Sequence, residues 1–286
     1  MNDCAGVLSQ LFVYPVKSCA GIALASTRIK ETGLEHDRAW MIVDQAGRFV
    51  AQRQIPHLCW IATALTDDQL VLSAPGFDSI HVPLDHTGLA CQVTVWNDTV
   101  SALDMGDAVA DWLDTFLAIP GRRFRLVRFA GHSPRLSDQA WTRGVPAPNQ
   151  FSDGFPILVI TQGAVDELNR RLRAQGLEPV GVQRFRPNIV LSGLEAHEED
   201  QLGRIVVRTG AGDVALDLVK PCTRCSIPDI NPYTAMASSP VGATLAGYRG
   251  LARMQGATCV GVNAILREGA GRSLYTGQPF VAEYAI

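Results

Sequence analysis

The sequence VKPCTRCSIPDINP occupies residues 219–232 and contains two cysteines, Cys222 and Cys225, three positions apart. Three prolines in this stretch prevent a continuous helix, so it is predicted to form an irregular loop. The preceding residues, 212–219, alternate between apolar and polar side chains, which is typical of a strand. A strand followed by a rigid loop can hold one side chain still at the rim of a sheet. A lysine and an arginine beside the thiols favour the thiolate, which is both a nucleophile and a metal ligand. The stretch is therefore predicted to carry the chemistry of the protein.

The cysteine pair is compatible with four kinds of site. A structural zinc site needs about four nitrogen or sulfur ligands, and no spaced histidine pair follows the two cysteines. The remaining cysteines are scattered singly: Cys4, Cys19, Cys59, Cys91 and Cys259. A thioredoxin-type redox pair opens a helix, which Pro228 disfavours. Two half-buried thiols without a function are the third alternative. The fourth is a single thiolate that binds a soft transition metal or carries sulfur, and the cationic neighbours favour it.

The composition limits the classes of partner. The chain has 286 residues, of which 47% are hydrophobic, so it can bury one large core or two modest ones. Its formal net charge of −3 gives no reason to expect nucleic acid or an anionic membrane as a partner. No basic leader and no run of about 18 apolar residues is present, so neither a secretory signal nor a membrane span is expected. Seven irregularly spaced cysteines indicate reduced thiols and a cytoplasmic protein.

The first half of the chain consists mainly of short predicted strands. Evenly spaced strands predict a barrel or a coiled antiparallel sheet. The predicted strands cover residues 8–14, 23–29, 39–44, 48–53, 59–65, 69–73, 78–82 and 91–96. One amphipathic helix is predicted over residues 104–119, with Pro120 at its end.

Two sets of polar residues stand at the ends of predicted strands. Lys17 and Ser18 end the first strand, and Arg38 lies in a loop; taken alone, each is typical of a solvated surface. Arg186 precedes a proline, so its backbone is predicted to be extended, with Asn188 facing the same side. An arginine and an amide on one face can bind a phosphate group together.

The second half contains a further candidate region for an anion. Asp153 and Phe155 lie in a turn before a buried strand, and Thr161 is predicted to cap a helix over Gln162–Ala174. The N-terminus of a helix has free amides that suit an anion. Asn263 lies on a later strand whose glycine allows close backbone approach.

Taken in order, four motifs resemble those of MOSC-domain proteins that carry an N-terminal MOSC β-barrel domain. This family includes the mitochondrial amidoxime reducing component and its bacterial relatives. The motifs are YPVKSC at residues 14–19, HDRAW at 36–40, FRPN at 185–188 and PCTRC at 221–225. The resemblance extends from about residue 8 to residue 284. It implies a β-rich α+β fold, with an N-terminal β-barrel-like domain over residues 1–125 and a MOSC domain over residues 126–286.

The resemblance also implies a site for a molybdenum cofactor. In the family the second cysteine of the pair ligates molybdenum, which corresponds to Cys225 here. The residues implied to bind the pterin and the phosphate, or to support them, are Lys17, Ser18, Arg38, Asp153, Phe155, Thr161, Arg186, Asn188, Thr223, Arg224 and Asn263.

The activity implied by the resemblance is the reduction of N-hydroxylated compounds, such as amidoximes and hydroxylamines. The electrons are expected to come from a separate flavin or iron–sulfur protein. MOSC domains also occur in molybdenum-cofactor sulfurases, so a carrier of the cofactor or of sulfur, without turnover of its own, is the alternative. A third alternative is a binding module held together by zinc.

Overall fold

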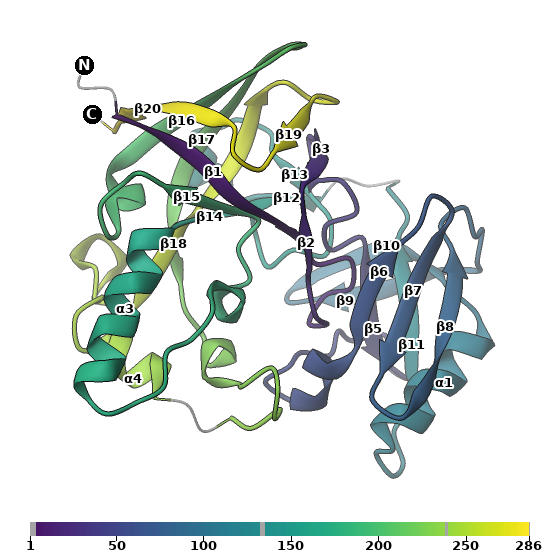
Figure 1. Cartoon of the computed structure of the whole chain (residues 1–286). Coiled ribbons are helices and arrows are strands. Elements are labelled where there is room, and N and C mark those ends of the chain that lie inside the picture. Colours follow the sequence, from purple (N-terminus) through teal and green to yellow (C-terminus); the bar gives the residue numbers. More distant parts are fainter. Residues whose placement is uncertain (1–3, 132–134, 238–239, 286) are drawn as a thin grey trace.

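The computed structural model describes residues 4–131, 135–237 and 240–285, and in it two β-rich parts lie side by side (Figure 1). The larger part is a barrel of seven strands, which closes because β1 pairs with β15. In order around the barrel the strands are β15 (Ile189–Ser192), β14 (Ile157–Thr161), β18 (Cys259–Glu268), β17 (Gly212–Thr223), β16 (Leu202–Thr209), β20 (Pro279–Tyr284) and β1 (Cys4–Val13). The pair β14 and β15 is parallel, because α3 (Gln162–Ala174) connects them as a crossover.

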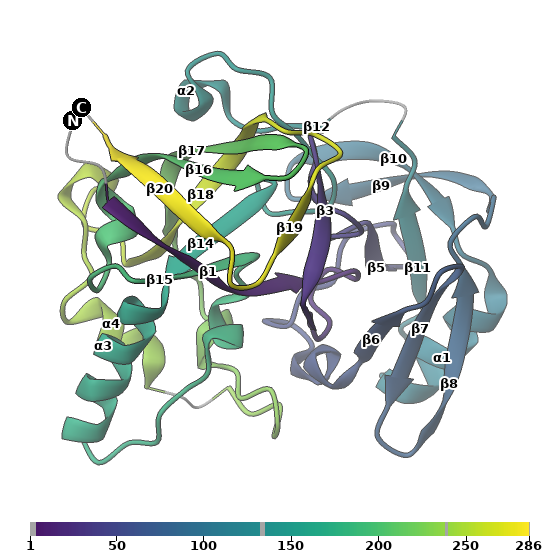
Figure 2. The same ribbon diagram turned by 45° about the horizontal axis from the view of Figure 1, so that its top comes forward.

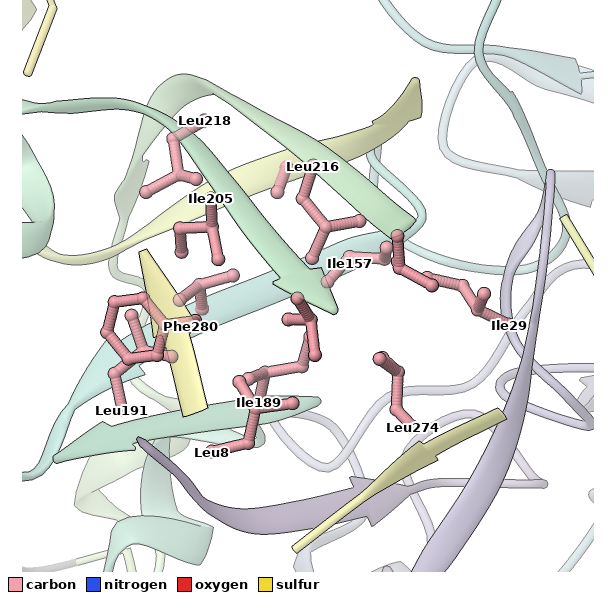
Figure 3. Close-up of a cluster of buried hydrophobic side chains, with 14 of the residues drawn as sticks. Leu8, Ile29, Ile157, Ile189, Leu191, Ile205, Leu216, Leu218, Leu274 and Phe280 are labelled. Carbon is pink, nitrogen blue, oxygen red and sulfur yellow. The ribbon is translucent and has the colours of Figure 1, made fainter. Parts of the chain in front are cut away.

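Branched aliphatic side chains fill the barrel. Figure 3 shows leucine and isoleucine side chains from several strands, together with Phe280, converging on its interior. Successive residues of a strand point to opposite faces, so an alternating segment such as that in β17 sends Val214, Leu216 and Leu218 inward. Full burial of such a side chain contributes about 1.5–3 kcal/mol, which makes this cluster the main source of stability of the barrel.

The strand β1 belongs to the barrel although it stands first in the sequence. Leu11 lies opposite Ile189 of β15, and Cys4 lies opposite Ala282 of β20. The other six strands of the barrel all follow residue 156. The division of the chain into domains over residues 1–125 and 126–286 stays a prediction. In space the first range contributes β1 to the barrel that the second range otherwise forms.

The smaller part is a half-barrel built from two antiparallel sheets around a separate core (Figure 2). One sheet has the order β5 (Trp40–Asp44), β11 (Phe124–Phe129), β10 (Asp98–Asp104) and β9 (Ala90–Val95). The other consists of β6 (Ala62–Leu65), β7 (Gln69–Ala74) and β8 (Phe77–Pro83). The predicted β-rich α+β class with two barrel-like parts is thus confirmed.

The helix α1 (Asp107–Leu117) is shorter than the predicted residues 104–119. Asp104 is still paired in β10, and Gly106 has a φ of 95°, which an α-helix does not accommodate. The helix therefore begins one residue after this glycine.

The second half carries the other helices. The predicted helix over Gln162–Ala174 is confirmed as α3, with the hydroxyl of Thr161 accepting a hydrogen bond from the amide of Ala164. The short helices are α2 (Gln139–Thr142) and α4 (Val241–Ala246). Within the described ranges, no helix has both the length and the apolar character needed to cross a bilayer. The seven cysteines are all free thiols.

The remaining elements are short. The strands are β2 (Ile22–Leu24), β3 (Ser26–Lys30), β4 (Gly33–Leu34), β12 (Arg135–Leu136), β13 (Pro148–Asn149) and β19 (Ser273–Tyr275). The 3₁₀ turns are η1 (Pro56–Trp60), η2 (Val182–Phe185), η3 (Glu198–Gln201), η4 (Ile227–Asp229) and η5 (Ala252–Met254).

The cysteine stretch is less irregular than predicted, because β17 continues through Pro221 and Cys222 to Thr223. The pairing of β17 with β16 ends at Asp217, so Pro221 lies where one side of the strand no longer pairs with that neighbour. The register with β18 also shifts on both sides of Pro221. A proline is tolerated at such irregular, one-sided positions because its missing N–H breaks no ladder bond. Cys222 therefore lies on a strand, whereas Cys225 lies in the loop after it.

Candidate functional site

A cavity lies between the two parts of the molecule, and eleven of the twelve predicted site residues line it. From the N-terminal half it is lined by Lys17, Ser18, Arg38, Phe49, Ala51 and Arg53. From the second half it is lined by Ser152, Asp153, Gly154, Phe155, Leu158, Phe185, Arg186, Asn188, Cys222, Thr223, Arg224, Cys225, Ile227 and Asn263. Thr161 is the predicted residue that the structure does not bring to this cavity.

Lys17 connects the two sides of the cavity. It follows the end of β1, and only 6% of its surface is exposed. Its Nζ donates to the carbonyl of Phe151 at 2.8 Å and to Oδ1 of Asp153 at 2.5 Å. Burial lowers the pKa of Lys17, and the Asp153 carboxylate opposes that effect. The ammonium group is therefore held at the wall of the cavity by one carboxylate from the other half. The neighbouring Ser18 has a φ of 70°.

Arg38 is fixed by three acceptors. Its Nη1 donates to Oδ2 of Asp37 at 2.6 Å and to Oδ1 of Asn188 at 3.2 Å. Its Nη2 donates to the carbonyl of Arg186 at 3.0 Å. The Asp37 side chain is completely buried, so this ion pair is largely shielded from water. Arg38 itself has a positive φ of 48°.

Arg186 is not extended, contrary to the prediction from the proline that follows it. Its backbone is left-handed, with φ 55° and ψ 46°, because it ends the 3₁₀ turn η2 and donates its N–H to the carbonyl of Gln183. Its Nη1 donates to the carbonyl of Cys19 at 2.6 Å, whereas its buried Nη2 has no hydrogen-bond partner among the described residues. Burial lowers the pKa of Arg186 to about 10, and the charge of Arg38 acts in the same sense. Ser18, Arg38 and Arg186 thus share left-handed backbones, a form of strain that clusters at functional sites.

Asn188 lines the cavity, but its amide group binds the protein itself. Its Oδ1 accepts from the N–H of Leu158 at 3.0 Å as well as from Arg38, and its Nδ2 donates to the carbonyl of Phe12 at 3.2 Å. The side chain therefore joins β1 and β14 beneath the guanidinium of Arg38.

The two cysteines differ in their surroundings. Cys225 is exposed, and its thiol makes no hydrogen bond within the described part of the chain. Cys222 is half-buried, and Nη1 of Arg224 donates to its sulfur at 3.1 Å. The second terminal nitrogen, Nη2, donates to the carbonyl of Phe185 at 2.9 Å. Arg224 is thus anchored between Cys222 and η2, while the sulfur of Cys225 is available to a ligand.

The remaining predicted residues have mixed environments. Asn263 on β18 lines the cavity and donates to the carbonyl of Lys220 at 3.2 Å. The ring of Phe155 lies 5.8 Å from Nζ of Lys220. Thr161 is fully buried, caps α3 and donates its hydroxyl to Oε2 of Glu199 at 2.6 Å. Its hydroxyl therefore already has partners within the fold.

Sequence reasoning did not single out Arg53 or Phe49, which also line the cavity. Both lie in the second arm of the predicted hairpin, residues 48–53, where an arginine and a phenylalanine are ordinary surface residues. The structure forms only isolated bridges in this arm, at Arg48 and Phe49. The guanidinium of Arg53 lies 4.9 Å from the ring of Trp96, which in turn packs against Phe49. No local pattern marks these residues, because the contacts arise only where the folded chain brings this segment to the cavity and to Trp96.

The charge of the cavity fits an anionic ligand. Among the described lining residues five are cationic, namely Lys17, Arg38, Arg53, Arg186 and Arg224, and one is a carboxylate, Asp153. The Nη2 of Arg186 and the Nε of Arg224 are buried without hydrogen-bond partners in the described ranges. Buried guanidinium groups with free donors are suited to phosphate oxygens. An exposed thiol in the same cavity adds a soft ligand for a metal.

The described residues do not supply a conventional metal site. No three histidine, cysteine, aspartate or glutamate side chains gather there in a way that could hold a metal ion. A metal in this cavity would therefore need further ligands besides these protein side chains, such as those that a cofactor brings.

Comparisons with known proteins agree with the motifs. Residues 5–120 match the MOSC N-terminal beta barrel domain family, and residues 146–278 match the MOSC domain family. The mouse mitochondrial amidoxime-reducing component 1 is 32% identical over 254 residues, which cover 85% of this chain and 72% of that protein. The rat mitochondrial amidoxime reducing component 2 is 30% identical over 81% of this chain and 68% of that protein. The human molybdenum cofactor sulfurase is 29% identical over 82% of this chain but only 28% of its own length. The chain therefore belongs to the family of proteins that combine a MOSC N-terminal beta barrel domain with a MOSC domain.

Proposed function

We propose that this protein is a molybdenum-cofactor-dependent reductase of N-hydroxylated compounds. The observation that carries the proposal is the meeting of one exposed thiol, Cys225, with five cationic side chains in a single cavity between the two parts. The relatives named as amidoxime-reducing components match most of the chain, which supports the same class of substrate.

The lining residues fit the cofactor in two respects. A phosphorylated pterin brings a phosphate dianion, and Lys17, Arg38 and Arg186 offer an ammonium and two guanidinium groups for it. The Cys225 thiolate is the proposed molybdenum ligand. Two-electron redox chemistry is what a bound molybdenum cofactor supplies, while the protein provides ligand, orientation and field.

The proposed overall reaction converts an N–OH group to N–H and water. It consumes two electrons and two protons, so a donor must deliver reducing equivalents for each turnover. We propose a separate flavin or iron–sulfur protein as that donor. The chain's own residues hold the cofactor, and the positive cavity wall lowers the free energy of any anion formed there.

The test is to compare the purified protein with its Cys225→Ser and Cys222→Ser variants. Molybdenum content is measured by elemental analysis, and benzamidoxime reduction is measured with an artificial electron donor. We expect Cys225→Ser to abolish activity and Cys222→Ser to weaken it, because Cys225 is exposed in the cavity whereas Cys222 is bound by Arg224.

Each outcome separates the alternatives. Equal loss in both variants would contradict a single thiolate ligand. Tight cofactor binding without turnover would favour a carrier of the cofactor or of sulfur, the role suggested by the relatives named as molybdenum cofactor sulfurases. Protein prepared with the cofactor in excess that holds neither molybdenum nor pterin would refute the proposal.

A further inference from the structure

The guanidinium groups of Arg38 and Arg186 both lie over the ring of Tyr14. The central carbon of Arg38 is 4.4 Å from the ring centroid, and that of Arg186 is 4.2 Å from it. Tyr14 is 1% exposed, so the contact is shielded from water. The face of an aromatic ring is negative and attracts cations, most strongly where water is excluded.

The backbone and its neighbours hold the ring in this place. The N–H of Tyr14 donates to Oδ1 of Asp37 at 2.8 Å, and its carbonyl accepts from the N–H of Arg38 at 2.9 Å. Gly21 packs directly against the ring edge, since a Cβ there would lie 2.4 Å from Cε1 of Tyr14. The ring is therefore fixed to the same loop that carries Arg38.

Two buried guanidinium groups held close together repel each other. The charge of Arg38 contributes to lowering the pKa of Arg186, which shows that the two cations interact. Asp37 pairs with Arg38, whereas Arg186 donates to a backbone carbonyl and has no ion pair with a described carboxylate. The ring of Tyr14 is the shared neighbour that favours both positive charges.

We propose that Tyr14 is a positioning residue, whose ring holds Arg38 and Arg186 ready for an anionic group before that group arrives. Pre-organisation of this kind raises affinity, because the ordering of the two long side chains does not have to accompany binding. The inference rests on the proposed function only in taking phosphate as the anion.

The hydroxyl of Tyr14 has no part in this role. Its oxygen is buried and has no hydrogen-bond partner among the described residues. Burial raises the pKa of Tyr14 to about 12, so the hydroxyl stays protonated at neutral pH. Phenylalanine at this position keeps the ring face and removes a polar group that makes no bond.

The test measures the affinity of the full chain, prepared without cofactor, for inorganic phosphate by calorimetry. Removal of the ring in Tyr14→Leu is expected to weaken phosphate binding about tenfold. The conservative Tyr14→Phe should stay within about twofold of the wild type, because it keeps the ring face that both guanidinium groups contact. Gly21→Ala, which displaces the ring without removing it, should also weaken binding severalfold. The matched control is Gly210→Ala, at a turn with open space around the added methyl group.

A second readout distinguishes positioning from a merely structural role. In the wild type and in Tyr14→Phe, the ring current should shift the NMR signals of the Arg38 and Arg186 guanidinium protons upfield, and Tyr14→Leu should remove that shift. Phosphate affinity equal to wild type in Tyr14→Leu, or in Gly21→Ala if the leucine variant does not fold, would overturn the inference. A protein that binds phosphate in this way yet never carries molybdenum would refute the proposed function and leave the role of Tyr14 intact.

Discussion

Replacing Glu199 with glutamine is predicted to remove a pH dependence from the stability of the fold. Glu199 is fully buried in η3, which contacts β14 and β18 of the barrel. The hydroxyl of Thr161 donates to its Oε2, while its Oε1 has no hydrogen-bond partner in the described part of the chain. Burial raises the pKa of Glu199 to about 7, although the hydrogen bond from Thr161 acts against that effect.

The sign and size of the effect follow from the proton affinity of the two states. The folded chain binds this proton more tightly than the unfolded chain, in which the pKa is near 4.5. The stabilising contribution is therefore complete below about pH 4.5 and is lost as the pH rises to about 7. The difference between the two pKa values corresponds to about 3 kcal/mol in the free energy of unfolding.

The assay is urea unfolding from pH 4.5 to pH 8, for the wild type and for Glu199→Gln. The glutamine variant stays neutral at every pH. The difference in free energy of unfolding between the variant and the wild type should therefore increase from pH 4.5 to pH 8, by up to about 3 kcal/mol. Burial lowers the pKa of His197 to about 4, and this group contributes in the opposite sense at acid pH. The difference between the two proteins isolates Glu199, because His197 is present in both.

The exposed Glu31 provides the control. Glu31→Gln removes one solvent-exposed carboxylate and should leave the pH dependence of the free energy of unfolding unchanged. If the curves of the wild type and Glu199→Gln are parallel across the whole range, burial does not perturb this carboxyl group and the reasoning is refuted.

Three further substitutions test other parts of the structure. Thr161→Val should lower the free energy of unfolding by about 1–2 kcal/mol through loss of the α3 cap, with molybdenum content unchanged. Reduced cofactor content at full stability would instead support the predicted binding role of Thr161. Arg186→Met should raise the melting temperature of the cofactor-free chain, because it removes a buried guanidinium that has no ion pair with a described carboxylate. The same variant should bind phosphate more weakly. A lower melting temperature together with full phosphate binding would contradict the account of Arg186. Lys17→Met should reduce molybdenum content while leaving Asp153 without its ion pair, and unchanged cofactor content would exclude Lys17 from the site.

The sequence was most informative where local chemistry determines the structure. The helix α3 was predicted to the residue, because Thr161 provides a side-chain cap and the apolar positions follow a helical period. Eleven of the twelve residues predicted for the site line one cavity, although their meeting there depends on tertiary structure. Their binding roles stay predictions.

Predictions failed where the fold overrides a local preference. The proline after Arg186 favours an extended backbone, yet the end of η2 requires a left-handed one. Pro221 suggested a loop, but β17 has lost its pairing with β16 at that point and can accommodate a proline. The contact of Arg53 with Trp96 and that of Tyr14 with Arg186 could not be predicted, because each joins residues far apart in the sequence.

The closure of the barrel by β1 has a consequence for folding during synthesis. This strand leaves the ribosome before its hydrogen-bonding partners β15 and β20, which are made roughly 180 and 275 residues later. Until then β1 lacks its barrel neighbours on both edges, and its apolar residues, such as Leu8 and Leu11, have no barrel to join. Pairing between such distant segments is slow, and exposed strand edges favour aggregation. The growing chain is therefore expected to expose these strand edges to aggregation until the last barrel strand has emerged.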